Sequence, residues 1–229
     1  MNLWQRTLLI VGVPLAAITA AVLHQPAKPE PAPYHLTKIA ADGKTLPPWA
    51  GPWSCVCDRT TGLLWEVKTD DEGIHDGLWT YSWYRAGAAG FHTAARTNLA
   101  EPLPEAGVPD NGDCYFEKTR CDTEDLIRRT NRQTLCGENN WRLPTSVELA
   151  SLIYPLAKAG QAKIDTDYFP HTKHGDYWTA DEGDTLQNVY RHLQTGAEAI
   201  SFIEGEKFTI PHRNAAFVRL VSADSKSCH

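Results

Sequence analysis

The sequence predicts a mixed α+β domain stabilised by disulfide bonds, with two main helices and mostly antiparallel strands. Three observations support this prediction: strand patterns lie on either side of two helix patterns, six cysteines follow an apolar leader, and the chain is long enough for one core. Strands and helices in separate runs, without alternating βαβ units, are typical of the α+β class. Roughly 190 residues remain after the N-terminal tail of leader and proline run, which is the usual size of one domain.

The leader, residues 1–24, has the layout of a signal peptide or an N-terminal membrane anchor. Arg6 and the amino terminus are positive, residues 7–23 are almost wholly apolar, and residues 19–21 are small enough for a cleavage point. The apolar run is short for a bilayer span, which needs about 20 residues, so cleavage is favoured over anchoring. Either outcome predicts an exported body, periplasmic or secreted, and the second adds a membrane tether.

Residues 25–48 are predicted to be a proline-rich linker, and the folded domain is expected over residues 49–229. Four prolines fall within residues 25–33. Proline lacks a backbone donor and disfavours helix, so this run is an extended, semi-rigid spacer.

The charge balance argues against nucleic acid as a partner. The formal net charge is −6, and the sequence contains no polybasic stretch. Binding to phosphates requires a basic surface, so no nucleic-acid partner is expected.

An even number of cysteines after an export leader predicts disulfide bonds. Zinc is disfavoured because Cys55 and Cys57 lack the Cys-x₂-Cys spacing. Cys114 and Cys121 flank a short polar run, so a bond between them closes a small loop. On a strand, Cys55 and Cys57 share a face and would strain a mutual bond, so each is expected to pair with Cys136 or Cys228, in an order left open.

Residues 54–58 and 63–68 are predicted to be paired strands, with a turn at 59–62 in which Gly62 has a positive φ. Residues 79–84 are a further strand candidate. No periodicity is visible over residues 85–113, which are expected to form a long surface loop.

Two helices are predicted in the middle of the chain. The first begins after Asp122, whose carboxylate caps the amides, and runs over residues 123–134. The second follows Pro144, where Thr145 and Glu148 form a capping box. Its apolar face is expected to lie in the core and consists of Leu149, Leu152, Ile153 and Leu156.

The last third of the chain is predicted to be strands. Alternation favours strands at residues 177–180, 188–194 and 199–203, with the last two joined in a hairpin at 195–196. A final strand is expected at residues 217–221.

Several motifs resemble those of one bacterial family, the Lcl C-terminal domain family, over about residues 53–221. They are Cys55-Val-x-Asp-x-Thr-Thr-Gly-Leu-x-Trp-Glu-Val-Lys68, Cys121-Asp-Thr, Cys136-Gly-x-x-x-Trp-Arg-Leu-Pro-Thr145, Tyr177-Trp-Thr and Val218-Arg-Leu-Val221. The Arg142–Thr145 element is also similar to one in the formylglycine-generating-enzyme family. These resemblances imply an extracytoplasmic domain with a C-type-lectin-like fold, but they imply no activity.

The resemblance also implies residue roles. Cys57 stands where the family pattern has Arg, and Cys228 is likewise extra, which implies a Cys57–Cys228 bond. Cys55–Cys136 and Cys114–Cys121 then remain as the ordinary pairs. Trp65 and Trp141, inside family motifs, are assigned to the core, and the forked donors of Arg142 are expected to hold the turn before Thr145.

No catalytic, metal or cofactor site is predicted from the sequence. Gly-x-Ser-x-Gly is absent, and His171 and His174 lack a third ligand at suitable spacing. The acidic loops 110–113 and 181–184 do not match calcium-loop spacing and are interpreted as turns. Seven tryptophans of the body suit a core, although exposed indoles also suit sugar rings.

The function expected from the sequence is that of an exported, non-enzymatic binding or adhesin-like module whose partner is a glycan or a surface protein of the envelope. The first alternative is a structural accessory subunit of an envelope assembly. The second alternative is a cryptic enzyme, which would require titratable groups converging in a cleft.

Overall fold

The computed structural model describes residues 35–86, 106–114, 121–193, 195–223 and 225–228. The chain divides into two units, Met1–Tyr34 and His35–His229, and every described residue belongs to the second. The leader and the proline run therefore lie outside the described residues. Within the described ranges, no helix is long and apolar enough to cross a bilayer.

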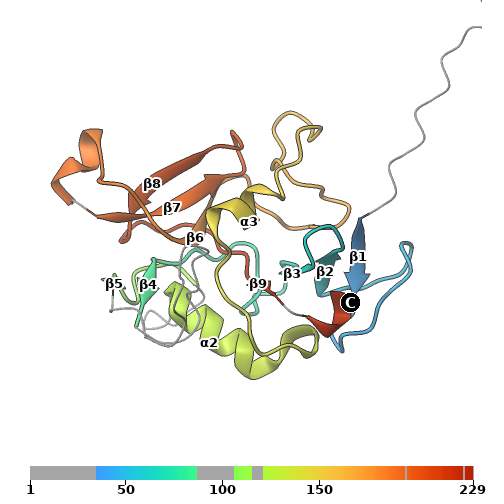
Figure 1. Ribbon diagram of the computed structural model, residues 1–229. Helices are drawn as coiled ribbons and strands as arrows, with labels where there is room; N and C mark the ends of the chain where they lie inside the picture. Colours follow the sequence, from blue (N-terminus) through green and yellow to red (C-terminus); the bar gives the residue numbers. More distant parts are fainter. Residues whose placement is uncertain (1–34, 87–105, 115–120, 194, 224, 229) are drawn as a thin grey trace, which may run out of the picture. The chain divides into compact units, whose positions relative to one another are not determined.

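A four-stranded antiparallel sheet occupies one end of the domain (Figure 1), in the order β1-β2-β3-β9. Its strands are β1 (Leu36–Ile39), β2 (Cys55–Asp58), β3 (Leu63–Glu66) and β9 (Val221–Ser222). The predicted hairpin is confirmed: β2 pairs with β3, and Gly62 has a φ of 71° in the turn. β1 lies inside the segment expected to be linker, so the folded body begins before residue 49.

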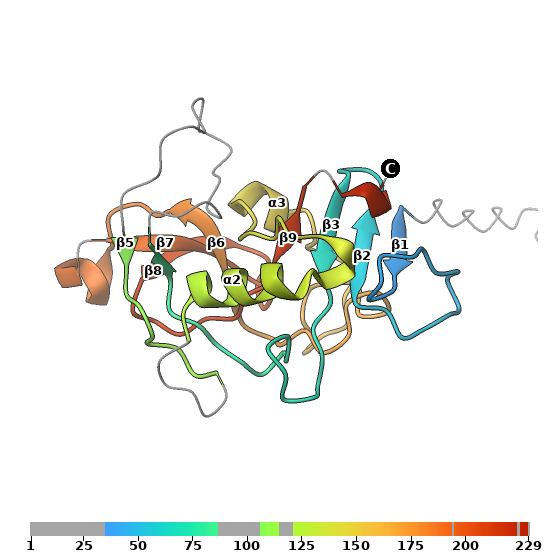
Figure 2. The ribbon, with the colours of Figure 1, turned by 90° about the horizontal axis from the view of Figure 1, so that it is seen from below.

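A three-stranded antiparallel sheet lies toward the other end, in the order β6-β7-β8. Its strands are β6 (Asp176–Glu182), β7 (Gly196–Ser201) and β8 (Lys207–Pro211). A short pair, β4 (Tyr84–Arg85) and β5 (Ala106–Gly107), lies beside it (Figure 2). The end of β4 and all of β5 lie within residues 85–113, which were expected to form one surface loop, so that expectation is wrong at these strands. Residues 87–105 are outside the described part.

Two α-helices are present among the described residues, as predicted. In α2 (Thr123–Gln133), the Asp122 side chain accepts a hydrogen bond from the Asp125 amide at 2.8 Å. In α3 (Ser146–Ala150), Thr145 and Glu148 form the predicted capping box. Short 3₁₀ turns complete the assignment: η2 (Leu135–Gly137), η3 (Asn188–Leu193) and η4 (Lys226–Cys228).

The second helix is shorter than its apolar pattern predicts. Leu149 and Leu152 are buried, but α3 ends at Ala150 and Leu156 is 77% exposed. Pro155 explains the difference, because it lacks a backbone donor and disfavours helical backbone at the preceding residue. The expectation that Leu156 belongs to the core is therefore wrong.

The strand prediction for residues 188–194 is also wrong. Residues 188–193 form the 3₁₀ turn η3, and residue 194 lies outside the described part. Val189 is 75% exposed, so the alternation does not mark a buried face. β7 pairs instead with β6 and β8, which replaces the hairpin expected at 195–196. The predicted strand 217–221 is reduced to β9, and residues 80–82 form only isolated bridges before β4.

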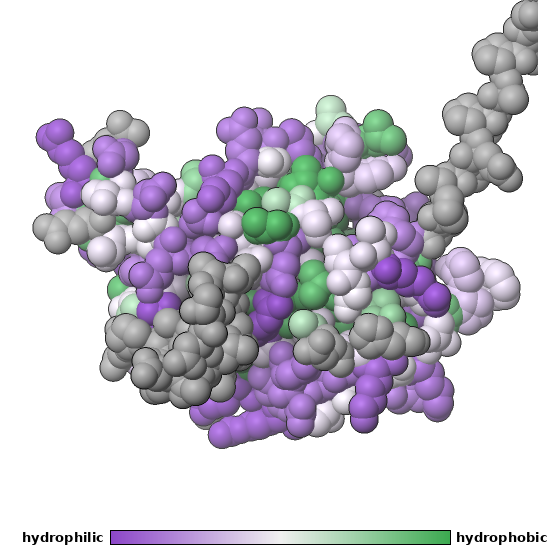
Figure 3. Space-filling view, viewed as in Figure 1, coloured by the Kyte–Doolittle hydropathy of each residue, from purple (hydrophilic) through white to green (hydrophobic). Residues whose placement is uncertain are grey.

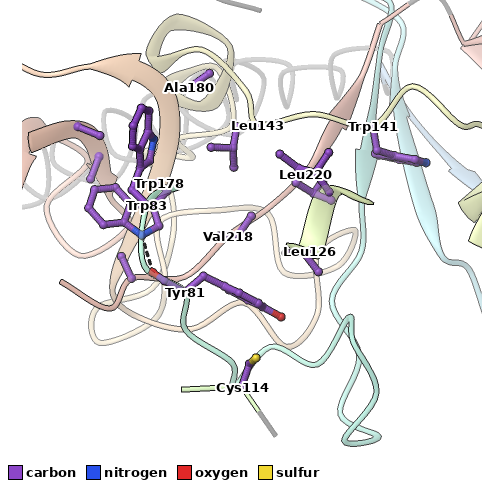
Figure 4. Close-up of a cluster of buried hydrophobic side chains, with 14 of the residues drawn as sticks. Tyr81, Trp83, Cys114, Leu126, Trp141, Leu143, Trp178, Ala180, Val218 and Leu220 are labelled. Carbon is purple, nitrogen blue, oxygen red and sulfur yellow. Dashed lines mark hydrogen bonds between the residues drawn. The ribbon is translucent and has the colours of Figure 1, made fainter. Parts of the chain in front are cut away.

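The core contains the tryptophans of the family motifs. Trp65 and Trp141 are 0% and 1% exposed, as expected of core residues. Trp83 and Trp178 are also fully buried, and the Trp178 indole donates to the Tyr81 carbonyl at 2.7 Å (Figure 4). Burying four indoles removes much apolar surface from water, which is the main driving force for folding.

Three disulfides cross-link the described chain, two of them between residues far apart in sequence. Cys55 bonds Cys136 and Cys57 bonds Cys228, with Cα–Cα distances of 6.5 and 5.5 Å. Cys114 bonds Cys121, with a Cα–Cα distance of 5.3 Å. These are the pairs that the family resemblance implies. Persistent disulfides form in oxidising compartments, so the domain is extracytoplasmic.

Candidate functional site

The candidate site surrounds η3, the turn that connects β6 to β7 and projects at the end of the three-stranded sheet (Figure 1). The Gly183 amide donates to the Gly196 carbonyl at 2.9 Å and closes the base of this connection. A Cβ at Gly196 would lie 2.2 Å from the carbonyl oxygen of Ile210, so the backbones approach more closely than any side chain permits. This close packing leaves one cavity on each side of the connection.

Cavity A has a volume of about 420 Å³ and lies between β5 and the ends of β6, β7 and β8. Its polar lining comes from Glu182, His212 and Arg213, and its other lining residues are Ala106, Gly107, Val108, Gly183, Leu193, Thr195, Gly196 and Pro211.

Two polar side chains of cavity A, Glu182 and His212, contact buried residues of the core. Glu182, whose side chain is 60% exposed, lies 2.5 Å from Nη2 of Arg85, which is buried. The His212 ring stacks on the indole of Trp83 with centroids 4.6 Å apart. Burial lowers the pKa of His212, although the Glu182 charge opposes the shift. The imidazole is therefore neutral at pH 7, and its buried Nε2 has no hydrogen-bond partner in the described structure.

Cavity B has a volume of about 410 Å³ and lies between η3 and the strands β7 and β8. Tyr190 and Phe208 supply aromatic surface, with Tyr190 39% exposed. Glu198 and Lys207 lie on the same wall, with Oε1 and Nζ 2.6 Å apart. The other lining residues are Asp184, Thr185, Leu186, Gln187, Val189 and Thr209.

Cavity B combines the two kinds of group that bind a sugar. Aromatic faces pack against the apolar C–H face of a pyranose ring, as the sequence-level argument about tryptophan proposed for indoles. Carboxylate, ammonium and hydroxyl groups then bond to the ring hydroxyls. In the ion pair between Glu198 and Lys207, the ammonium group is 54% exposed and the carboxylate side chain is 14% exposed, so Lys207 is open to a ligand and Glu198 only in part.

A buried charge network lies away from both cavities, on β3 and the segments packed against it. Glu66 is fully buried, and its Oε1 lies 2.8 Å from Nζ of Lys68 and 2.7 Å from Nδ1 of His75. Its Oε2 accepts from the Leu220 amide at 2.8 Å, and Arg219 donates to its backbone carbonyl. Burial alone would raise the pKa of Glu66, but Lys68 and His75 outweigh it and hold the pKa at about 2. The network is structural, since Glu66 and Lys68 are closed to solvent.

The residues assigned a structural role before α3 lie together. Nη1 and Nη2 of Arg142 each donate a hydrogen bond of 2.7 Å to the Glu148 carboxylate, which also accepts a hydrogen bond from the Thr145 amide at 2.8 Å. Burial opposes ionisation of Glu148, but the Arg142 bonds hold its pKa below the usual value. The Trp141 indole donates to the Leu135 carbonyl at 3.1 Å, which fixes the segment that precedes Arg142.

The residues weighed as metal ligands are dispersed. Among the described residues, no group of three or more His, Cys, Asp or Glu is arranged around one point. In the loop 110–113, the Asp110 amide donates to Asp122, and in the loop 181–184, Asp181 accepts from the Ser146 amide at 2.7 Å. Asp110 lies in a turn, as interpreted from the sequence, but Asp181 and Glu182 are the last residues of β6, so the turn expected at 181–184 is wrong.

Apart from residues 182–184, which belong to an acidic loop considered above, sequence reasoning missed the residues of both cavities. Tyr190 lies in a segment predicted to be a strand, and Phe208 and His212 lie in segments with no motif. The cavities form only when residues near 107, 190 and 210 meet, which no local pattern records. The glycines at 183 and 196 are the one local signal, because isolated glycine often marks close backbone approach.

Comparisons with known proteins identify one family. The model of the Lcl C-terminal domain matches residues 54–222, from β2 to β9. The match includes η3 and the residues that line both cavities, and it excludes β1, the loop that follows it, and Cys228. A search of curated proteins and a search of solved structures found no match. The C-type-lectin-like architecture implied by the sequence therefore stays a prediction at the level of fold family.

Proposed function

Because the chain belongs to the Lcl C-terminal domain family, we propose that it is a non-enzymatic, adhesin-like module, working in the periplasm or outside the cell, that binds a glycan in cavity B. The observation that supports this proposal most directly is the pairing of aromatic and polar groups there. Tyr190 and Phe208 offer ring faces, and Glu198 and Lys207 offer hydrogen-bonding groups on the same wall. Such a combination suits an uncharged or weakly charged sugar.

The test is a glycan-binding screen on the fully oxidised protein, followed by titration of the best ligand. Tyr190→Ala is expected to weaken binding about tenfold, because one aromatic contact of this kind is worth about 1.5 kcal/mol. Tyr154→Ala is the matched control, since Tyr154 is also 39% exposed but lies just after α3, away from the lining of cavity B. Uniformly flat binding across the screen, or equal losses in both variants, would contradict the proposal.

A second candidate function, a structural accessory subunit of an envelope assembly, is supported by apolar surface over α3. Figure 3 shows hydrophobic residues gathered on this face. Val147 and Leu156 are 79% and 77% exposed, and Tyr154 and Ile203 are about four-tenths exposed. Exposed apolar surface of this kind is typical of protein–protein contacts. Crosslinking in envelope extracts separates the two functions. A stable, stoichiometric crosslinked partner that is absent from the Val147→Asp variant would favour the structural subunit over the glycan-binding module.

A cryptic enzyme would use cavity A, where a neutral imidazole and a carboxylate line one space. We favour a structural role for both groups, because His212 is stacked on Trp83 and Glu182 is paired with Arg85. Hydrolytic assays on ester and glycoside substrates test this preference. Turnover that disappears in His212→Gln and persists in Tyr190→Ala would establish the enzyme instead.

A further inference from the structure

The segment between the spacer and the matched domain contains an exposed, uncharged loop. Residues 47–52 read Pro-Pro-Trp-Ala-Gly-Pro, and the family match begins only at residue 54. Trp49 is 86% exposed, whereas the four core tryptophans are at most 1% exposed. The loop therefore lies outside the matched domain, and it presents an indole to the outside.

Trp49 lies at the apex of a turn. The Ala50 amide donates to the Pro47 carbonyl at 3.0 Å, which closes a turn with Pro48 and Trp49 at its centre. Proline is preferred at the second position of such a turn, so the backbone of the turn is stiff. The turn therefore holds the backbone of Trp49 at the apex, where its side chain is exposed.

The base of the loop is fastened to the domain through Trp53. Its indole donates to the Tyr168 carbonyl at 2.9 Å, and Nζ of Lys38 lies 3.6 Å from its ring centroid. A Cβ on Gly51 would lie 3.3 Å from the Trp53 ring, so the two are in close contact. The anchored base and the exposed apex together present Trp49 as a fixed projection.

We propose that residues 47–52 form a membrane-contact loop, in which Trp49 enters the interfacial layer of a lipid bilayer. Tryptophan is favoured at this level because its ring is apolar and its N–H can still bond to water or headgroups. The loop carries no charge that would have to leave water. The lipid surface is preferred over a protein groove because the predicted leader, where it stays uncleaved, anchors the same chain to a bilayer.

Chain length keeps the loop within reach of that bilayer. Only residues 25–34 separate the predicted leader from the folded unit, which begins at His35. A chain of this length can span at most about 35 Å. An uncleaved leader would therefore hold the folded unit close to the membrane surface, where even a weak contact is populated.

The loop lies at the opposite end of the folded unit from the cavities. In both Figure 1 and Figure 2, β1 and the chain that follows it are at one end, and η3 with β7 and β8 is at the other. A unit docked through Trp49 therefore directs cavities A and B away from the bilayer. This inference does not depend on what the cavities bind.

The test uses the full chain in vesicles of phosphatidylethanolamine and phosphatidylglycerol, with and without brominated acyl chains that quench tryptophan. Emission of Trp49 is obtained as the difference between the wild type and Trp49→Phe, so that the leader and core tryptophans cancel. We expect brominated lipid to remove most of this difference emission, and ordinary lipid to shift it to shorter wavelength. The double variant W49F/V189W is the control, because Val189 is 75% exposed at the opposite end, and its added emission should stay unquenched.

Equal difference emission in brominated and ordinary vesicles would overturn the proposal. So would a blue shift that requires an added envelope protein in place of lipid, because it would assign Trp49 to a protein groove. If the leader is cleaved, the mature product as isolated is mixed with the same vesicles. Trp49→Ala is then expected to reduce its partitioning into vesicles about tenfold, and unchanged partitioning would again reject the loop.

Discussion

The two sheets of the domain differ in their covalent cross-links and in the cavities beside them. In the four-stranded sheet, all residues of β2 and β3 are buried, β2 carries two disulfides, and Glu66 is neutralised by buried partners. The three-stranded sheet contains no cysteine between residues 176 and 211 and ends at η3, where side chains are exposed and two cavities open. Two of the three disulfides and the buried charge network lie at the four-stranded end, called here the stable end, and both cavities lie at the other, called the recognition end after the proposed function.

Removing the Cys55–Cys136 bond should have the largest effect. Its sequence separation is 81 residues, so the double variant Cys55→Ser/Cys136→Ser is expected to lose about 4–5 kcal/mol of unfolding free energy in the chain-entropy picture. The Cys114–Cys121 bond, with a separation of 7, should cost only about 2 kcal/mol. Denaturant unfolding measures both. Equal losses would show that loop length does not govern the contribution of these bonds.

Glu66→Gln tests the buried network of the same sheet. The change leaves Lys68 buried without its charge partner, and breaking a buried pair typically costs about 3–5 kcal/mol. The matched control is Glu198→Gln on β7 of the three-stranded sheet, because its partner Lys207 is 54% exposed and stays solvated. Its loss should be below about 1 kcal/mol by denaturant unfolding, as for other exposed pairs. A large loss in the control and a small one in Glu66→Gln would invert the comparison between the two sheets.

The same carboxylate predicts a pH dependence. The pKa of Glu66 is about 2 in the folded protein against 4.5 for the ordinary group, so the unfolded chain binds the proton more readily. Stability from this group is present above about pH 4.5 and is lost as the pH falls toward 2, by about 3 kcal/mol in total. Unfolding free energies measured from pH 7 to pH 2 should show the loss in the wild type and a smaller one in Glu66→Gln.

Thr145→Ala should have a moderate effect, because it removes the side-chain cap of α3. Loss of such a cap typically costs about 1 kcal/mol. Ser151, at the other end of α3, is exposed, and Ser151→Ala should change the unfolding free energy by less than about 0.5 kcal/mol. A larger loss in Ser151→Ala than in Thr145→Ala would show that the capping box does not hold this helix.

The smallest effect on stability is expected at the recognition end. Tyr190 is 39% exposed, so Tyr190→Ala should change the unfolding free energy by less than about 0.5 kcal/mol while it weakens glycan binding. Thermal unfolding and ligand titration on the same sample separate the two quantities. Coupled losses of stability and binding would mean that cavity B belongs to the stabilising part of the fold.

Local patterns predicted the stable end well and the recognition end poorly. The β2–β3 hairpin, the Asp122 cap and the Thr145 capping box each depend on residues within a few positions, so the sequence records them directly. Leu156 has the spacing of a core residue, but one proline before it ends the helix.

The candidate site could not be predicted for a related reason. Tyr190 belongs to a segment whose hydrophobic alternation resembles that of a strand, although it forms η3. It lines the same cavity as Phe208, and this arrangement depends on the pairing of β7 with β8, which lies outside any local pattern. The burial of Glu66 was not predicted either, because among its partners only Lys68 is close in sequence, whereas His75 and the Leu220 amide are 9 and 154 positions away. Charge alone would have placed this glutamate at the surface.

The bond between Cys57 and Cys228 has a consequence for biogenesis. Its two thiols are 171 positions apart, so Cys57 is exported long before Cys228. Until Cys228 arrives, the Cys57 thiolate can attack Cys136 in the Cys55–Cys136 bond, which forms a Cys57–Cys136 bond and releases the Cys55 thiolate. Chains with Cys228→Ser are therefore expected to contain rearranged disulfides, which non-reducing peptide mapping would detect.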